Sequence, residues 1–568
     1  MEVLCESLQV ARMNEAIQGI LFDMGGTLRM SVKPNPAEKA SALRRIIDLL
    51  GTEMESGELE TLLHERSRKY AAWARSTLNE LNEQDLWVKW MLPDWPSEII
   101  RPIAIQLNEA FRNSYSKRIL FDETPDVIIS LYRRGYRLGL VSNTTSSVEI
   151  PEVLRKLRLR GYFDVVLLSA LEGKRKPSDY LLRSAAEIMD LSPSTCAYIG
   201  DQPSRDVAAA RKAGFSSAVI LKDPRNHPEP REEDTLYVPD STIGNLKDLL
   251  EIFPPREPCQ PARTYAASLS TMWAGNNFTS LADFFEFARR SGFCNVELNH
   301  KVTSAMLSEV DLAHAAVSSI HEPCPADIST DVLAKNDWLI SSLDEEKRQE
   351  GVKAILRSID LAHRWGIPAI VVHAGNVRAM DNSMERQLRK WIELGEQGAP
   401  EFTTLQAQMR AERRELSPRS LDSVRKSLEE LLSHAAPFGI RLGLENRAHY
   451  REIPSPDELA SLLDLAAPEQ LGFVFDVGHA WHLGVLGFYS IDEWLDRFSA
   501  RIIGTHLHDV IGLNDHFAAG LGEMRFAEIA ARLPEGAFRT CEFLDSNTPQ
   551  QVRAGLRFLH DQGCIKEY

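Results

Sequence analysis

Residues 472–479 read Gly-Phe-Val-Phe-Asp-Val-Gly-His, an apolar run that ends in an acid and, three residues later, an imidazole. An uninterrupted apolar run is typical of a strand buried on both faces of a parallel sheet. Helical patterns separate it from seven similar runs, which gives expected strands at 266–270, 295–298, 316–320, 369–372, 441–444, 472–475, 502–505 and 540–543. Eight strands alternating with helices predict a (β/α)8 TIM barrel, with a helical insertion at 381–420 after the fourth strand.

Polar side chains stand at the ends of most of these strands. The residues are His321, His373, Glu445, Asp476, His506 and Glu542. Because the C-terminal ends of barrel strands meet on one face, we expect these groups to converge. Imidazoles and carboxylates together are ligands for Zn²⁺, Mn²⁺, Co²⁺ or Mg²⁺. The loops beyond the strands add His479, His508, Asp515 and His516. Five other histidines lie in or near helical patterns and are expected to be structural: His300, His314, His363, His434 and His560.

The N-terminal half shows a different βα alternation. The apolar stretch 18–22 runs into Asp23-Met24-Gly25-Gly26-Thr27-Leu28. Helical patterns fill residues 36–118, and strand patterns return at 136–141, 165–168, 197–199 and 218–221. Open α/β sheets bind ligands at the carboxyl ends of their strands, which is where Asp23 falls. The sequence therefore predicts an α/β, Rossmann-like domain with a helical cap inserted after its first strand.

Three further positions in this half carry polar groups suited to phosphoryl chemistry. Ser142-Asn143 follows one strand, Lys176 precedes a helix, and Asp201 follows another strand with Asp206 five residues on. An Asp can act as a nucleophile, a Ser hydroxyl and a Lys can hold phosphoryl oxygens, and the later acids can hold Mg²⁺.

The boundary between the two halves is a run of prolines. Four prolines fall within residues 254–261, and such a segment cannot continue a helix or a central strand. We expect an N-terminal domain over 16–253, with its cap at about 32–120, a linker at 254–263 and the barrel over 264–568.

The composition of the chain indicates which classes of molecule it could bind and in which compartment it is found. The 568 residues include 81 acidic and 65 basic ones, a net charge of −16, and this disfavours a nucleic-acid partner, which Lys and Arg would have to bind. The seven cysteines contain no CxxC pair, which fits a reducing compartment. No apolar run reaches the roughly 18 residues that cross a bilayer, and the first residues lack a signal-peptide pattern. We expect a cytoplasmic protein acting on a small phosphorylated or polyhydroxylated molecule; the sequence leaves a homo-oligomer open.

The four N-terminal motifs together resemble the haloacid dehalogenase-like hydrolase superfamily. That resemblance implies Asp23 as the phosphoryl-accepting nucleophile, and Lys176 as the group that neutralises the phosphoryl charge. It also implies a phosphate-binding set of Thr27, Ser142, Asn143 and Lys176, and an Mg²⁺ site made by Asp23, the main-chain carbonyl of Gly25, Asp201 and Asp206. Phosphatases of the superfamily usually carry a second Asp at the position of Gly25. Its proton transfer is typically worth about 10²–10⁴-fold. A weak or vestigial phosphatase is therefore an alternative.

The C-terminal motifs, from Val371-Val372-His373-Ala374-Gly375 to Gly520-Leu521-Gly522-Glu523, resemble the xylose isomerase-like TIM-barrel superfamily. Its sugar phosphate isomerase/epimerase group implies one divalent metal, such as Mn²⁺, Co²⁺ or Zn²⁺, held by Glu445, Asp476, His506 and Glu542. The resemblance also implies that Glu445 and Glu542 shuttle a proton through an enediolate. Substrate contacts are expected from His321, His373, His479 and His508.

The whole chain is thus expected to be a bifunctional phosphatase and isomerase or epimerase. The alternative is similarity to endonuclease IV of the same superfamily, whose trinuclear zinc site needs further ligands. His321, His373, His479, Asp515 and His516 offer more imidazole than a mononuclear isomerase requires. A non-enzymatic binding module is a third interpretation, which a measurement of bound metal tests.

Overall fold

A computed structural model describes residues 17–226, 231–311 and 315–568. Contacts divide the chain into two compact units, one ending at Cys259 and the other beginning at Gln260. We call them the N-terminal and the C-terminal unit. His314, expected to be structural, lies outside the described residues.

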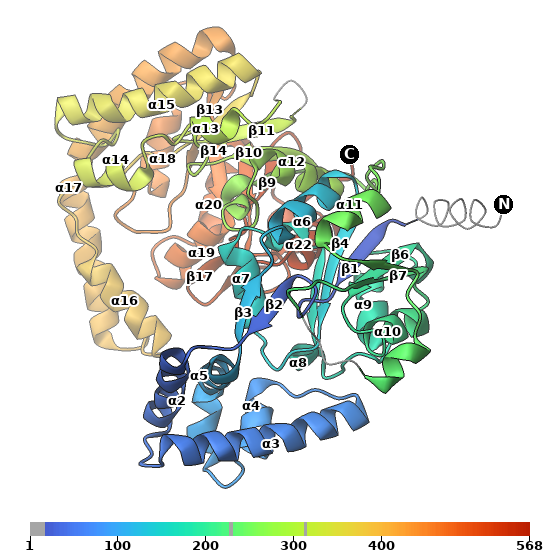
Figure 1. Ribbon diagram of the computed structural model, residues 1–568. Helices are drawn as coiled ribbons and strands as arrows, with labels where there is room; N and C mark the ends of the chain where they lie inside the picture. The colour runs from blue at the N-terminus through green and yellow to red at the C-terminus, as the bar shows by residue number, and fades with distance from the viewer. Residues whose placement is uncertain (1–16, 227–230, 312–314) are drawn as a thin grey trace. The chain divides into compact units, whose positions relative to one another are not determined.

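The N-terminal unit is built on a six-stranded sheet in which every neighbouring pair is parallel. Its order is β5-β4-β1-β6-β7-β8, and the strands are β1 (Gly19–Phe22), β4 (Arg137–Ser142), β5 (Val165–Leu168), β6 (Cys196–Gly200), β7 (Ser217–Leu221) and β8 (Ser241–Ile243). Strands β1, β6 and β7 are buried along their whole length, as expected when helices cover both faces of a parallel sheet. The helices are α6 (Thr124–Arg133), α7 (Glu149–Lys156), α8 (Ser169–Glu172), α9 (Tyr180–Ile188), α10 (Asp206–Ala213) and α11 (Leu249–Ile252) (Figure 1).

A helical cap follows β1. Its helices are α2 (Pro36–Leu50), α3 (Ser56–Thr77), α4 (Glu83–Leu86) and α5 (Ser97–Tyr115), and the π-helical turn Trp87–Met91 follows α4. They enclose an apolar core of their own around Leu63, Trp87 and Leu107. Two antiparallel strands, β2 (Arg29–Val32) and β3 (Lys117–Leu120), lead the chain into and out of the cap.

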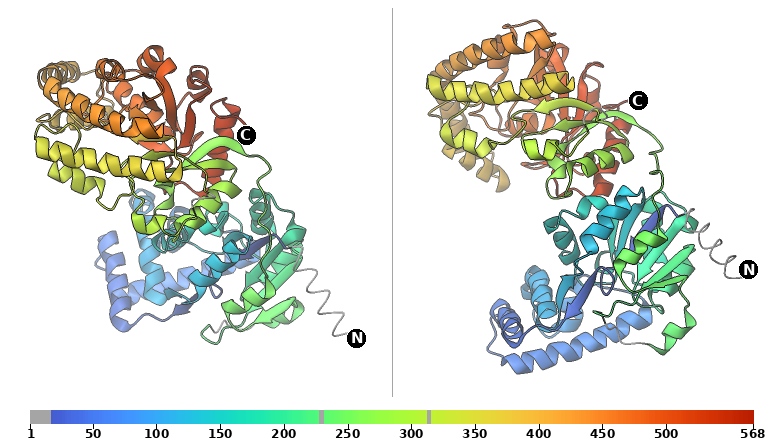
Figure 2. Two further views of the ribbon diagram at one scale, coloured as in Figure 1. Left: turned by 90° about the horizontal axis from the view of Figure 1, so that it is seen from above. Right: turned by 45° about the horizontal axis from the view of Figure 1, so that its top comes forward.

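The C-terminal unit is a closed barrel of eight parallel strands with helices around it (Figure 2). The strands are β9 (Tyr265–Ser270), β10 (Phe293–Leu298), β11 (Val317–His321), β12 (Ala369–Val372), β13 (Arg441–Glu445), β14 (Leu471–Asp476), β15 (Ile502–Leu507) and β18 (Phe538–Cys541). The predicted α/β fold class, with a Rossmann-like domain and a TIM barrel, is confirmed. A hairpin of β16 (Asp509–Ile511) and β17 (Asn514–Phe517), which the sequence analysis did not predict, stands in the loop after β15.

The helices between the barrel strands include one much longer than expected. They are α12 (Leu281–Arg290), α13 (Ser304–Leu307), α14 (Thr330–Asn336), α15 (Glu345–Trp365), α16 (Ser383–Glu393), α17 (Pro400–Ala435), α18 (Pro456–Leu463), α19 (Val477–Val485), α20 (Ile491–Phe498), α21 (Phe526–Ala530) and α22 (Pro549–Asp561). The insertion predicted to end at Ser420 runs on to Ala435, because the second half of α17 is also the helix that joins β12 to β13. It packs beside α15, where Arg348 donates to Ser427 Oγ (2.8 Å) and pairs with Glu430 (2.7 Å) (Figure 1).

The proline-rich segment contains no helix or strand between residues 254 and 263. Its first residues contact the N-terminal unit: the Tyr136 hydroxyl donates to the Pro254 carbonyl, and the Arg256 amide donates to the Arg134 carbonyl. Among the described residues, no helix combines the length and the apolar character that crossing a bilayer demands.

Candidate functional site

The three acids and one imidazole expected to bind metal converge in the barrel. Glu445, Asp476, His506 and Glu542 come from β13, β14, β15 and the residue after β18. Each offers a ligand atom within 4.8 Å of the others, and none is more than 1% exposed. The centre of the group is His506 Nδ1, which lies 2.7 Å from Glu445 Oε1, 3.1 Å from Glu542 Oε2 and 3.6 Å from Asp476 Oδ2. The geometry that the sequence predicted for these side chains is therefore present.

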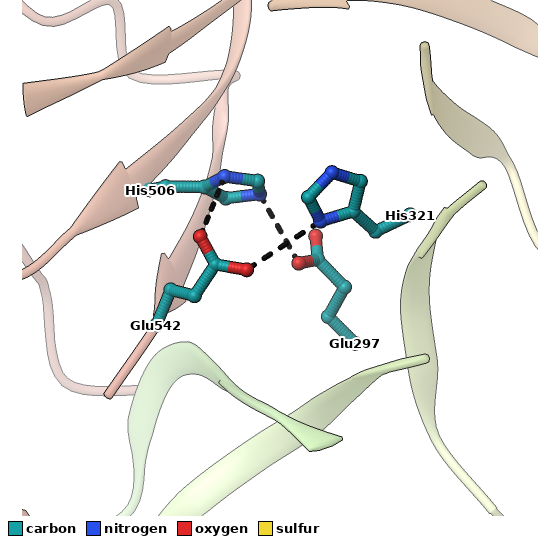
Figure 3. Close-up of side chains that lie close together, drawn as sticks. All are labelled: Glu297, His321, His506 and Glu542. Carbon is teal, nitrogen blue, oxygen red and sulfur yellow. Dashed lines mark ion pairs between the residues drawn. The ribbon is translucent and has the colours of Figure 1, made fainter. Parts of the chain in front are cut away.

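A fourth carboxylate, Glu297, joins this group, and the sequence analysis did not identify it. Its Oε1 lies 3.1 Å from His506 Nε2, on the other edge of the ring from Glu542 (Figure 3). His321 also joins the group, because its Nδ1 lies 3.4 Å from Glu542 Oε1. Glu297 lies within β10 and its side chain points into the barrel. It was not among the predicted metal ligands because it does not follow the end of a strand.

The buried atoms of this cluster are short of partners. Glu297 Oε1, His321 Nδ1, His506 Nε2 and Glu542 Oε1 are buried and make no well-aligned hydrogen bond, although they lie in pairs at ion-pair distance from one another. An unpaired buried polar atom is costly, and several carboxylates in one dry pocket repel one another. A divalent cation would relieve both costs, and oxygen and imidazole nitrogen are donors it accepts. The residues present therefore fit a metal ion.

The charges within the cluster are strongly coupled. Burial acts to raise the pKa of Glu542, but His506 and His321 hold it well below the usual range for a glutamate. Burial likewise opposes protonation of His506, yet Glu542 and Glu297 keep its pKa well above that of a free imidazole. In the absence of metal, the imidazolium is thus the cation that balances these carboxylates.

The residues expected to contact substrate divide into two groups. His321 Nε2 lies 2.6 Å from His373 Nε2, and His373 Nε2 lies 2.9 Å from Glu445 Oε2, so both rings line the same centre. His479 donates from Nδ1 to the Asn446 carbonyl (3.0 Å), which leaves its Nε2 for another partner.

His508 is placed differently from its expected role. Its Nε2 lies 3.1 Å from Asp476 Oδ1, and its Nδ1 accepts the His516 amide (3.0 Å). The ring is fully buried and stacked on His516, with ring centroids 4.1 Å apart. Both nitrogens are engaged within the protein, so His508 orients Asp476 and is not free to contact a substrate.

His300 also differs from expectation. It lies in the turn between β10 and α13, near a helix as expected, but its ring lies 5.4 Å, centroid to centroid, from that of His321. Burial lowers its pKa to about 4. It is therefore a neutral imidazole at the edge of the cluster.

A cavity opens beside the cluster. It has a volume of about 240 Å³, and its lining includes His373, Arg447 and Arg451. Arg447 donates to Glu445, and its Nη1 also lies 2.6 Å from His373 Nε2. The wall also contains the carboxylates of Glu322 and Glu452, so the cavity offers charged groups of both signs to a small polar molecule.

The N-terminal unit gathers its expected residues at one edge of its sheet. Asp23, Ser142 and Asp201 follow or end β1, β4 and β6, which are neighbours in the sheet. The topology reverses at β1, because the chain goes to β4 on one side and to β6 on the other. A switch point of this kind is where open α/β sheets bind ligands.

Lys176 is held against the nucleophile candidate. Its ammonium lies 3.1 Å from Asp23 Oδ1 and 2.8 Å from Asp206 Oδ1, and its side chain is fully buried. Asn143, expected to bind phosphate, accepts the Lys176 amide and donates to the Lys176 carbonyl, both at 2.9 Å. Asn143 thus fixes the Lys176 loop through its side-chain amide.

The glycine loop after β1 leaves room around Asp23. Gly26 has φ +81°, and an added Cβ would lie 2.0 Å from Asp201 Oδ2, so only glycine allows this approach. Gly25 has open space where a side chain would stand. The Thr27 hydroxyl is buried without a hydrogen-bond partner, as a group awaiting a phosphoryl oxygen would be.

The expected Mg²⁺ position is taken by a residue that the sequence analysis overlooked. Arg205 Nη2 lies 2.6 Å from Asp23 Oδ2, 2.6 Å from Asp201 Oδ1 and 2.8 Å from Asp206 Oδ2. A metal ion does not fit among these oxygens while the guanidinium is there. Asp206 also accepts the Asp201 and Gln202 amides, which fixes the loop.

An open α/β sheet with Asp23 at its switch point and a closed barrel with a polar rim define two enzyme-type units on one chain. The chain joins a haloacid dehalogenase-like hydrolase domain, matched by that family over residues 17–214, to a xylose isomerase-like TIM barrel, matched over 285–562.

Curated relatives include phosphatases. The glyceraldehyde 3-phosphate phosphatase of Methanopyrus kandleri is 26% identical over 240 residues, which cover 42% of this chain and 97% of that protein. The ribulose-1,5-bisphosphate 5-phosphatase of Halopiger xanaduensis is 24% identical and covers 41% and 98%. Among solved structures, a 3-keto-D-glucoside 4-epimerase from E. coli is 19% identical with a TM-score of 0.35, covering 50% of this chain and 95% of that one.

Proposed function

We propose that the barrel is a divalent-metal-dependent isomerase or epimerase of a small hydroxy-carbonyl compound, and that the N-terminal domain is a phosphatase acting through Asp23. The barrel proposal is carried by one observation: Glu445, Asp476, His506 and Glu542 bring buried ligand atoms within 4.8 Å of one another. A cation bound there would polarise the carbonyl and hydroxyl oxygens of a sugar and so acidify its carbon-bound proton.

Two glutamates are placed to move that proton. Glu445 and Glu542 both face His506 Nδ1, at 2.7 and 3.1 Å, so each carboxylate borders the same centre. Burial acts to raise the pKa of Glu445, but Arg447 and hydrogen bonds with His373 and His506 hold it well below its ordinary value. Glu445 is therefore ionised at neutral pH. Under this proposal one glutamate removes the proton beside the carbonyl to give an enediolate. That proton, or one that the second glutamate takes up from solvent, is returned to the neighbouring carbon by an isomerase, or to the opposite face of the same carbon by an epimerase.

The test is proton exchange at carbon. Candidate ketoses and aldoses, free and phosphorylated, are incubated with the protein in D₂O, and NMR detects deuterium at the carbon next to the carbonyl. We expect Glu445→Gln and Glu542→Gln each to slow exchange by about 10²–10⁴-fold. The exposed Glu469, just before β14, supplies the matched control Glu469→Gln, which should exchange at the wild-type rate. Absence of exchange across the panel contradicts the isomerase proposal.

The phosphatase proposal rests on Asp23 and Lys176. Asp23 would attack phosphorus, with Lys176, 3.1 Å away, neutralising the transferred group and Ser142 holding one of its oxygens. Phosphate release from small phosphomonoesters should fall to background in Asp23→Asn, while Asp122→Asn, at an exposed position, should retain it. Equal rates for wild type and Asp23→Asn would remove the nucleophile assignment.

A second function for the barrel is supported by its surplus imidazoles. Two further groups offer ligand atoms within 4.8 Å of one another: His321, His373 and Glu445, and His479, Asp515 and His516. The first shares Glu445 with the group described above, so neighbouring ions could be bridged. A multinuclear hydrolase of a small phosphorylated molecule would use such a set. Close to three metal equivalents per chain, with cleavage of a phosphodiester and no carbon exchange, would favour this function.

A further inference from the structure

Arg205 stands among the acids of the N-terminal domain as a metal ion would. A single atom, Nη2, contacts one oxygen from each of Asp23, Asp201 and Asp206, at 2.6–2.8 Å. Its Nε makes a further hydrogen bond to Asp206 Oδ1 (3.0 Å). The three carboxylates come from two strand ends and the start of a helix. A single positive charge in contact with all three offsets their mutual repulsion, as a bound metal cation would.

The charges of the site are already nearly balanced. Asp23, Asp201 and Asp206 carry three negative charges, and Lys176 and Arg205 carry two positive ones, so the group has a net charge of −1. Adding Mg²⁺ beside a charged Arg205 would leave the buried group positive, whereas Mg²⁺ in place of Arg205 would leave it neutral.

The second positive charge weakens the attraction of the site for a divalent ion. Arg205 adds its charge to that of Lys176, and both groups contact Asp206. A divalent cation bound beside two positive charges is repelled by them.

Arg205 is also free to withdraw. It precedes α10, and its side chain is 21% exposed, whereas those of Asp23, Asp201 and Asp206 are 8% exposed or less. The loop that carries it is fixed by main-chain bonds that its side chain does not make, including the Asp206 amide to the Gln202 carbonyl (2.8 Å). The guanidinium can leave without unfolding the loop.

From this geometry we infer that Arg205 is a tethered cation that competes with Mg²⁺ for Asp23, Asp201 and Asp206 and thereby sets the metal affinity of the N-terminal domain. The site is metal-free at Mg²⁺ concentrations that would fill the same carboxylates without Arg205, and binding of Mg²⁺ requires the side chain to leave. The inference deepens the phosphatase proposal, since it concerns how that same site is switched on.

The test is Mg²⁺ binding to the full chain, measured by isothermal titration calorimetry without substrate. We expect Arg205→Ser to gain a site at least tenfold tighter than any wild-type site that Asp201→Asn abolishes. Arg205→Lys, which keeps a cation, should stay weak. The double variant Arg205→Ser/Asp201→Asn should return to the wild-type isotherm, which separates this site from metal bound by the barrel.

Near-ultraviolet circular dichroism checks that each variant is folded; Arg205→Gln, which is longer than serine but uncharged, carries the same prediction should Arg205→Ser fail that check. The inference is overturned when wild type binds Mg²⁺ at an Asp201-dependent site as tightly as Arg205→Ser or Arg205→Gln. Because no turnover is measured, this outcome is distinct from a failure of the phosphatase proposal, which Asp23→Asn tests.

Discussion

Glu149 connects the two strands that lead into and out of the cap, and one cap helix, to the core of the N-terminal domain. It lies at the start of α7 and pairs with Arg29 of β2 (2.9 Å), Arg112 of α5 (2.5 Å) and Arg118 of β3 (2.5 Å). Glu149 is 21% exposed, and the arginine side chains are 7–12% exposed. One carboxylate therefore holds three guanidinium groups in a poorly hydrated place.

We predict that Glu149→Gln lowers the free energy of unfolding of this domain by about 3–5 kcal/mol at pH 7, the usual cost of removing one partner of a buried ion pair. The gross attraction is larger, about 5 kcal/mol for each pair at 3 Å and an effective dielectric constant of 20. Desolvation of the four groups and repulsion among the arginines offset most of it. Glu152→Gln, on the same helix but exposed, should change stability by less than about 0.5 kcal/mol.

The effect should depend on pH in one direction. Burial acts to raise the pKa of Glu149, but the three arginines hold it below the ordinary 4.5. The stabilisation is therefore fully present above pH 4.5 and is lost as the pH falls through the lowered pKa. Urea titrations in which unfolding is followed by hydrogen exchange and mass spectrometry measure the free energy of unfolding of this domain separately from that of the barrel. A difference between Glu149→Gln and wild type below 1 kcal/mol at pH 7, or one that grows on acidification, would refute the reasoning.

Three further predictions concern the barrel and the cysteines. Gly504→Ala places a Cβ 2.0 Å from the Phe538 ring and should destabilise the barrel by about 1–3 kcal/mol in urea titrations, whereas Gly536→Ala meets nothing within 4 Å and should be neutral. Gly478→Ala places a Cβ 2.1 Å from His508 Cε1, which would move the ring off Asp476 and weaken metal binding by about 10–100-fold in equilibrium dialysis; Gly484→Ala, on the same helix, is the control. Burial raises the pKa of the Cys196, Cys324 and Cys564 thiols to about 12, so iodoacetamide at pH 8 should label the partly exposed Cys259 before these three. Equal labelling of the four in the folded protein would contradict this.

Much of the barrel could be read from the sequence because each strand is an apolar run with a polar stop. Glu445 and Asp476 end their strands, His506 is the last residue but one of β15, Glu542 follows its strand, and the closed sheet necessarily brings those ends together. Glu297 escaped because it lies within a strand, where its Oε2 accepts from Ser319 (2.6 Å) and Thr540 (3.1 Å) of neighbouring strands. A single acid inside an apolar run was the available signal.

The roles of the residues that the sequence analysis missed or misassigned depend on side-chain orientation in the folded protein. Arg205 stands between Asp201 and Asp206 in a loop, and nothing local distinguishes an arginine that turns inward from one that points to water. His508 was expected to contact substrate, but the hairpin after β15, which was not predicted, supplies the His516 amide that occupies its Nδ1. In both cases the role of the side chain is set by contacts that local sequence patterns do not reveal.

The metal content of the purified chain tests the central claim most directly. The claim is that carboxylates and imidazoles at the rim of the barrel hold a catalytic divalent ion, while Arg205 keeps the N-terminal domain free of one. Elemental analysis after dialysis should find about one equivalent per chain, lost in Asp476→Asn and retained in Asp201→Asn. A wild-type protein with no bound metal, or with metal that Asp476→Asn leaves in place, would contradict the account.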